Sequence, residues 1–106
     1  MSGFDERKKG FENKFAHDEE TRFKITARRN RLLGQWAAER MGMAKAEADA
    51  YAKEVVAADF EEAGEEDVFR KITADLKKRG VDMSEHRIRK QMEELQIEAS
   101  KQVLGK

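Results

Sequence analysis

Residues 66–104 read EDVFRKITADLKKRGVDMSEHRIRKQMEELQIEASKQVL, which is two amphipathic segments separated by Gly80. In the first segment, apolar side chains recur at helical spacing up to Leu76. The second segment repeats them at steps of four, three, four and four, at Ile88, Met92, Leu95, Ala99 and Val103. This spacing places the five side chains on one face of an α-helix. The stretch therefore predicts two helices, the first over about 66–79, joined by a short turn.

Charged and capping residues mark the ends of these two helices. Acidic residues fill positions 65–67 at the start of the first helix, and basic residues fill 77–79 at its end. Both placements suit the helix dipole. Either Asp82 or Ser84 can cap the second helix. Asp82 stands at capping-box distance from Glu85, although aspartate is not the usual first member of that box.

Two further helical patterns precede this stretch. The earlier one runs from about Asp5 to Met41 and ends at Gly42. We expect the apolar residues of its second half to enter the core: Phe23, Ala27, Leu32, Leu33, Trp36, Ala37 and Met41. The later one runs from about Ala44 to Glu62 and ends at Gly64. Its apolar face comprises Ala48, Tyr51, Ala52, Val55 and Val56.

No segment alternates with period two, and the connections are short. We therefore expect an all-α protein, a small four-helix bundle over residues 19–106. The composition agrees, because 42% of the residues are charged, 39% are hydrophobic, and proline is absent. A core built from so few apolar residues must be thin.

The first eighteen residues carry a separate apolar stripe. Phe4, Phe11 and Phe15 are spaced by seven and four residues, so on a helix they point within roughly 40° of one direction. The next positions in phase, Asp18 and Arg22, are charged. Such a short stripe does not offset the entropy of ordering by itself. We expect residues 1–18 to form a protruding, partly disordered helical arm that binds a groove of a partner; the alternative is that the rings pack on the bundle as ordinary core.

Charge is unevenly distributed although the net charge is zero. Residues 1–31 have a net charge of +3, residues 32–67 of −7 and residues 68–106 of +4. The run Ala27-Arg28-Arg29-Asn30-Arg31 lies in the first basic block and could contact phosphates. This leaves a helical adaptor or a nucleic-acid-binding bundle as an alternative function. The simpler interpretation, which we favour, is a solvated face that pairs with the acidic second helix.

Signatures of metal sites and enzymes are missing. The acidic stretch 59–67 lacks the ligand spacing of a calcium loop. His17 and His86 are 69 positions apart, cysteine is absent, and no nucleotide-binding glycine motif or catalytic motif occurs. We expect no enzymatic activity, no metal and no cofactor, although adenine nucleotide binding between helices stays open. His17, at the junction of arm and bundle, could make binding depend on pH.

Targeting signals are equally scarce. No apolar run approaches 18 residues, and the amino terminus lacks the apolar core of a secretion signal. The lack of cysteine fits a reducing compartment. We expect a cytoplasmic protein without membrane insertion, and a monomer when free.

Several phrases of the sequence resemble the zeta subunit, the ATPase inhibitor of alphaproteobacterial F1Fo-ATP synthases. The resemblance covers almost the whole chain and is densest through Lys71. The phrases that carry it are FDER at 4–7, FE at 11–12, KFAHD at 14–18, ARRN at 27–30, LLG at 32–34, WAA at 36–38, AYAKEVV at 50–56, ADFEEAG at 58–64 and EDVFRK at 66–71.

The resemblance implies a function and a site. Members of this family bind the F1 head, at the alpha, beta and gamma subunits, and block ATP hydrolysis with an amino-terminal helix. The block is directional, so rotation in the synthesis direction continues. The protein would then be peripheral on the inner side of the plasma membrane through F1. Carried over by position, the F1-binding residues would be Phe4, Asp5, Arg7, Lys8, Phe11, Lys14, Phe15, His17 and Asp18.

Overall fold

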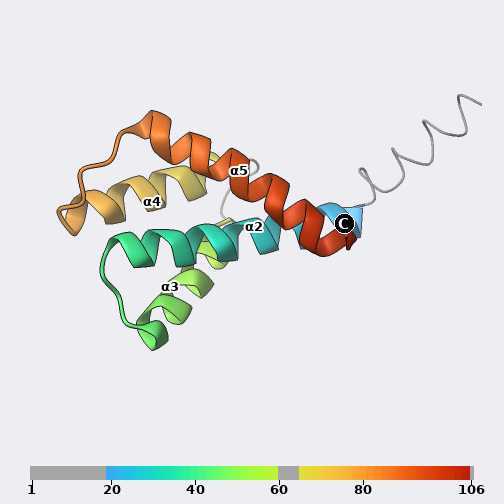
Figure 1. The fold of residues 1–106 in the computed structure, drawn as a ribbon, viewed down its shortest axis with the longest axis horizontal. Helices are drawn as coiled ribbons and strands as arrows, with labels where there is room; N and C mark the ends of the chain where they lie inside the picture. Colours follow the sequence, from blue (N-terminus) through green and yellow to red (C-terminus); the bar gives the residue numbers. More distant parts are fainter. Residues whose placement is uncertain (1–18, 60–64, 106) are drawn as a thin grey trace, which may run out of the picture.

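The computed structural model describes residues 19–59 and 65–105, and all regular secondary structure in these ranges is α-helical (Figure 1). The helices are α2 (Glu19–Arg40), α3 (Lys45–Ala58), α4 (Glu66–Lys78) and α5 (Glu85–Leu104). The predicted all-α, four-helix fold is confirmed. Helix α3 ends at Ala58, with Asp59 as its C-cap, four residues before the predicted end at Glu62. The predicted helix start near Asp5, and the positions Glu62 and Gly64 themselves, lie outside the described residues.

Helix α2 is the centre of the arrangement. It contacts α3, α4 and α5, and α4 also contacts α3 and α5. Helices α3 and α5 make no contact with each other within the described ranges. Figure 1 shows α2 and α5 running in opposite directions, so that the start of α2 lies beside the carboxyl-terminal end of α5. One side of α2 therefore lies open between α3 and α5.

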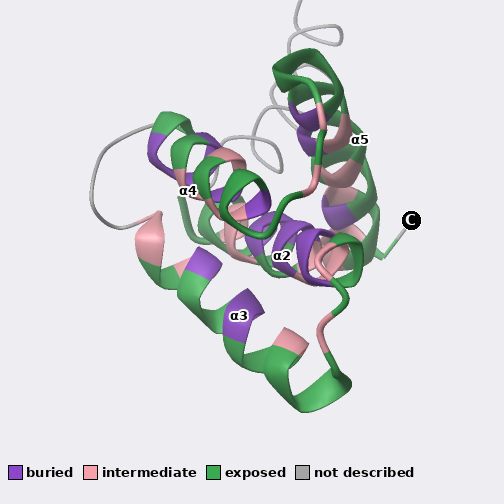
Figure 2. Ribbon diagram, turned by 90° about the vertical axis from the view of Figure 1, so that its left-hand side faces the viewer, coloured by how far each residue is buried: buried purple, intermediate pink, exposed green. Residues whose placement is uncertain are grey.

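The core is assembled from the apolar faces of all four helices (Figure 2). Its fully buried large side chains include Leu33, Val55, Val68, Ile72, Leu76, Ile88 and Met92. The stripes predicted in the third and fourth helices supply most of these residues. Of the predicted α5 stripe, Ile88, Met92 and Ala99 are buried, whereas Leu95 and Val103 are only partly buried.

The predicted core of α2 is partly wrong. Leu33 and Ala37 are fully buried as expected, but Phe23 is 55% exposed. Ile25, which the apolar pattern did not single out, is buried instead. Two positions along a helix turn the side chain by roughly 200°, so Phe23 and Ile25 point to nearly opposite sides. Phe23 lies on the side that α3 and α5 leave open.

Helices α2 and α3 approach each other closely at Gly34. A Cβ atom added to this buried glycine would lie 2.7 Å from the Cα of Ala52 and 3.2 Å from Cγ2 of Val55. The missing side chain lets the two backbones come together. Ala52 is itself small and 1% exposed, so the contact is built from the smallest residues.

The helix ends follow the sequence signals closely. Gly42 and Gly80 have φ of +76° and +77°, a conformation that glycine adopts without strain. After α4, the Val81 amide donates to the Leu76 carbonyl and the Gly80 amide to the Lys77 carbonyl, which is a Schellman motif. At the start of α5, the Ser84 hydroxyl accepts a hydrogen bond of 3.1 Å from the Arg87 amide. Ser84 is therefore the cap, and the capping role considered for Asp82 is wrong.

Ion pairs connect the acidic α3 to α4. Lys71 Nζ lies 3.2 Å from Glu54 Oε1, and Arg79 Nη2 lies 3.4 Å from Glu47 Oε2. Among the described residues no ion pair joins the basic stretch of α2 to α3; Arg29 lies 3.8 Å from Glu65, and Glu61 and Glu62 of the predicted acidic helix lie outside the described residues. Helix α3 faces α2 through Ala52 and other small or apolar residues, so its carboxylates are directed to the basic side chains of α4.

Arg89 connects α5 to α4 by two kinds of contact. Its guanidinium donates two hydrogen bonds of 3.1 Å to the carboxylate of Glu66. The guanidinium carbon Cζ lies 3.8 Å from the ring centre of Phe69. The pairing with Arg89 holds the pKa of Glu66 below its usual value. The stacked guanidinium also covers one side of the buried Phe69 ring.

Candidate partner-binding site

The arm predicted to bind the partner lies outside the described residues. This applies to all nine carried-over positions: Phe4, Asp5, Arg7, Lys8, Phe11, Lys14, Phe15, His17 and Asp18. The nearest described residues belong to α2. Helix α2 begins at Glu19, at the end of the bundle that also holds the carboxyl-terminal turn of α5.

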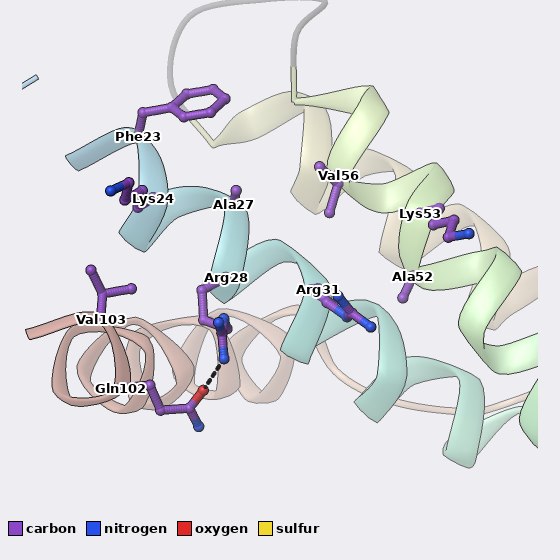
Figure 3. A pocket seen from close by; sticks show the side chains of 10 residues that line it. All are labelled: Phe23, Lys24, Ala27, Arg28, Arg31, Ala52, Lys53, Val56, Gln102 and Val103. Carbon is purple, nitrogen blue, oxygen red and sulfur yellow. Dashed lines mark hydrogen bonds between the residues drawn. The ribbon is translucent and has the colours of Figure 1, made fainter. Parts of the chain in front are cut away.

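A groove opens at this same end of the bundle, along α2 and between α3 and α5. Its volume is about 610 Å³. Figure 3 shows that α2 supplies Phe23, Lys24, Ala27, Arg28 and Arg31, that α3 supplies Ala52, Lys53 and Val56, and that α5 supplies Gln102 and Val103. The positions Phe23, Ala27 and Arg31 are four residues apart and therefore form one row along α2. We call this feature the α2 groove.

The α2 groove combines an apolar floor with a basic rim. Ala27, Val56 and Val103 are partly buried and line the floor. Arg28 donates a hydrogen bond of 2.8 Å to the Gln102 amide oxygen. Lys24 forms an ion pair with Glu20, in which Nζ lies 3.5 Å from Oε2. Arg31 and Lys53 have no hydrogen bond or ion pair with any described residue. Two cations at the rim are thus available to a ligand.

The basic run 28–31 does not form a continuous surface patch. Arg28 and Arg31 are exposed, but Arg29 is 4% and Asn30 1% exposed. Arg29 Nε donates to Asn30 Oδ1 at 2.7 Å, and its guanidinium lies 3.8 Å from Glu65. The expectation of a wholly solvated face is therefore wrong for these two residues. Helical spacing turns Arg29 and Asn30 away from the exposed Arg28 and Arg31, and Arg29 faces Glu65, just before α4.

This corner places acidic groups near the two buried residues. Burial raises the pKa of Asp59, and Asp67 and Glu65 raise it further by repulsion. The Asn30 amide and the Arg29 guanidinium favour the charged carboxylate but do not cancel these effects. The free energy of unfolding therefore depends on whether the carboxyl group of Asp59 is protonated.

A polar cluster joins α3 to α4 on another side of the bundle. The Tyr51 hydroxyl donates to Asp75 Oδ2 at 2.7 Å, and Lys71 Nζ donates to the same oxygen at 3.0 Å. Burial and the Asp75 carboxylate raise the pKa of Tyr51 well above its usual value. Burial lowers the pKa of Lys71, but the carboxylates of Asp75 and Glu54 outweigh it, so the net direction is upward. Tyr51 stays neutral and Lys71 stays charged at neutral pH, as befits a structural contact.

The described residues offer neither a metal centre nor a membrane span. In residues 19–59 and 65–105, no three acidic or histidine side chains gather closely enough to hold a metal ion. His86 is exposed on α5. None of the described helices is both long enough and apolar enough to cross a bilayer.

Sequence reasoning did not identify the α2 groove. The sequence contains the row Phe23, Ala27 and Arg31, but its apolar spacing predicts Phe23 in the core. The missing information was tertiary, because only the separation of α3 from α5 leaves that row accessible. An apolar residue flanked by basic ones, as in Arg22-Phe23-Lys24, was the signal that could have indicated an exposed edge.

The fold and the groove define a class of protein: a small all-α bundle whose candidate site, in the described part, is a binding surface. Comparison with known proteins gives the family. A profile of the family described as ATPase inhibitor subunit zeta matches residues 1–102, so the chain belongs to that family. A solved structure described as a solution NMR structure matches with a TM-score of 0.72 and 47% identity, covering 80% of this chain and 96% of that chain. The comparison with curated proteins gives no match.

The family match confirms the resemblance to the zeta subunit family that the short sequence segments indicated. It makes the protein a regulator of ATPase activity rather than an enzyme. It also implies interaction with the F1 part of ATP synthase.

Proposed function

We propose that the protein inhibits ATP hydrolysis by F1 by inserting residues 1–18 as a helix at an alpha/beta/gamma catalytic interface. The family match carries this proposal, because it begins at residue 1 and therefore includes the whole candidate arm. The stripe of Phe4, Phe11 and Phe15 supplies the apolar anchors that binding in a groove needs. Arg7, Lys8 and Lys14 stand beside them and would speed association with an acidic surface.

The proposed inhibition requires no chemistry. The interface between catalytic subunits opens and closes as the central shaft turns, so a helix that fits one state stabilises that state. The size of the effect depends on the difference in affinity between states. A helix that resists leaving the closed state stops rotation in the hydrolysis direction, while rotation in the synthesis direction releases it.

The bundle serves as the folded support of the arm in this proposal. We place the boundary between residues 18 and 19, because the phenylalanine stripe stops at the charged Asp18 and the next apolar set starts only at Phe23. The free protein is a monomer, and it is cytoplasmic, peripheral on the inner side of the plasma membrane through its contact with F1.

A nucleic-acid-binding bundle is the less supported function. That alternative depended on Arg28, Arg29 and Arg31 acting together on phosphates. Arg29 is buried beside Asn30, and the net charge of the chain is zero. Both observations weaken a phosphate-binding surface.

Inverted membrane vesicles that contain ATP synthase test the direction of the block. The protein is added at increasing concentration, and ATP hydrolysis and ATP synthesis are measured in parallel. We expect hydrolysis to fall while synthesis under a proton gradient is retained. Equal loss of both activities would contradict a directional block, and no loss of hydrolysis would contradict inhibition itself.

A further inference from the structure

We propose that the α2 groove is a second contact with F1, which binds an acidic helical segment with an apolar stripe on the outer surface of the F1 head. The inference rests on the proposed function, because it assigns a further binding surface for the same partner. The arm would block rotation, and the α2 groove would hold the bundle against F1 beside the arm.

The first argument is the accessibility of the apolar floor. Helices α3 and α5 both pack on α2 without contacting each other in the described ranges, so Ala27, Val56 and Val103 face an open groove. An apolar floor between two helices accommodates the apolar face of a third helix. The groove, at about 610 Å³, is large enough for several side chains.

The second argument is charge. Arg31 on α2 and Lys53 on α3 stand at the rim without an ion pair among the described residues, and Lys24 and Arg28 add positive charge nearby. An acidic flank on the bound helix would complement these cations.

The same argument disfavours two other occupants. Residues 1–18 contain four basic and four acidic side chains, so the chain's own arm offers no excess of negative charge. A second copy could offer α3, but of its three carboxylates Glu47 and Glu54 already pair with Arg79 and Lys71, which leaves only Asp49 without an ion pair among the described residues. A separate acidic partner therefore fits the rim best.

The third argument is position. Phe23 follows the end of the candidate arm by five residues, which is roughly 7.5 Å along an α-helix. A partner that holds the arm must therefore lie near the α2 groove. Once the arm is bound, contact with the groove is effectively intramolecular, and even a weak second contact then strengthens binding substantially.

A pair of charge-reversal variants tests the groove in the full-length protein. Arg31→Glu with Lys53→Glu reverses the two rim cations that have no ion pair in the described part. Lys77→Glu with Lys90→Glu is the matched control: it changes the net charge equally on exposed residues of α4 and α5 that do not line the groove. Helix content and thermal unfolding establish that both variants fold.

The readout is the concentration of protein that half-inhibits ATP hydrolysis by F1, at low and at moderate salt. We expect the rim variant to need about tenfold more protein, with the same residual hydrolysis at saturation, because the arm still makes the block. The control should match the unmodified protein. Equal half-inhibitory concentrations for the rim variant and the control would overturn the groove assignment while leaving the proposed function intact. No inhibition by the unmodified protein would overturn both.

A photo-reactive benzoylphenylalanine at Val56, with Lys90 as the control position, identifies the occupant without altering the rim charges. With F1 present, we expect an adduct from position 56 to an acidic, apolar-striped helix of an F1 subunit, and none from position 90. An adduct only to the chain's own arm, or to a second copy, would overturn the proposal. So would salt-sensitive binding of duplex DNA that the rim variant loses while its inhibition of F1 is unchanged.

Discussion

The Cα of Ala52 lies 2.7 Å from the point where a Cβ would stand on Gly34. These two residues fix the distance between α2 and α3. Because the contact leaves no room for a side chain, α3 is held close along one side of α2. The remaining side of α2, with Phe23, Ala27 and Arg31, stays open toward α5 and forms the α2 groove.

Gly34→Ala should destabilise the bundle. The added methyl group would collide with backbone, which costs about 1–3 kcal/mol when a core is overpacked, and the better helix propensity of alanine returns at most about 1 kcal/mol of this. We expect a lower midpoint in urea unfolding followed by circular dichroism. Gln35→Ala, one position along, should change stability by less than about 0.5 kcal/mol. A variant Gly34→Ala as stable as the unmodified protein would show that the helices separate easily.

Two isoleucines of α5 give a matched test of the core. Ile88 is 1% exposed and Ile97 is 59% exposed. Ile88→Val should therefore lower the free energy of unfolding by about 0.5–1.5 kcal/mol, whereas Ile97→Val should leave it nearly unchanged. The measurement is chemical unfolding of both variants under identical conditions. Equal effects would contradict the orientation of α5.

The start of α5 offers a test of the cap. Ser84→Ala removes the hydroxyl that accepts from the Arg87 amide and should cost about 1 kcal/mol of stability. Asp82→Ala removes the other candidate cap and should cost much less. Thermal unfolding distinguishes the two variants, and a larger loss for Asp82→Ala would mean that the helix begins with a different cap.

Asp59 makes stability depend on pH. Burial, joined by Asp67 and Glu65, raises its pKa in the folded protein above the ordinary value. The contribution of Asp59 to the free energy of unfolding is fully present below the ordinary carboxyl pKa of about 4, which applies to the unfolded chain. It is lost as the pH rises through the higher pKa that Asp59 has in the folded protein. Asp59→Asn should therefore be more stable than the unmodified protein at pH 7.

The gain from Asp59→Asn should shrink as the pH falls toward about 4, where the unmodified side chain takes up its proton. Unfolding by urea at several pH values measures this difference. Asp49→Asn, at an exposed position of α3, serves as the control and should show no such trend. A gain that grows at acidic pH would contradict a raised pKa for Asp59.

The fold was largely predictable from local sequence. The stripe of Ile88 and Met92, the glycines at 42 and 80, and the charges at the ends of α4 each act within one helix or turn. Such signals depend only on helical geometry, capping and the helix dipole. They define where helices begin and end, and which face is apolar.

The candidate site was less predictable, because it depends on which helices touch. Phe23 was expected in the core, since apolar spacing alone does not show that α3 and α5 leave its side of α2 open. Arg29 and Asn30 were expected at the surface, since charge alone does not show which side of α2 is buried. The arm stripe, Phe4, Phe11 and Phe15, stays a prediction from the sequence.

ATP hydrolysis by isolated F1, measured with added full-length protein and with protein lacking residues 1–17, tests the central claim most directly. Circular dichroism and thermal unfolding first establish that the shortened protein keeps its helices. We expect the full-length protein to inhibit hydrolysis and the shortened protein, folded as a bundle, to lose that inhibition. Full inhibition by the shortened protein would contradict the assignment of the arm as the inhibitory element.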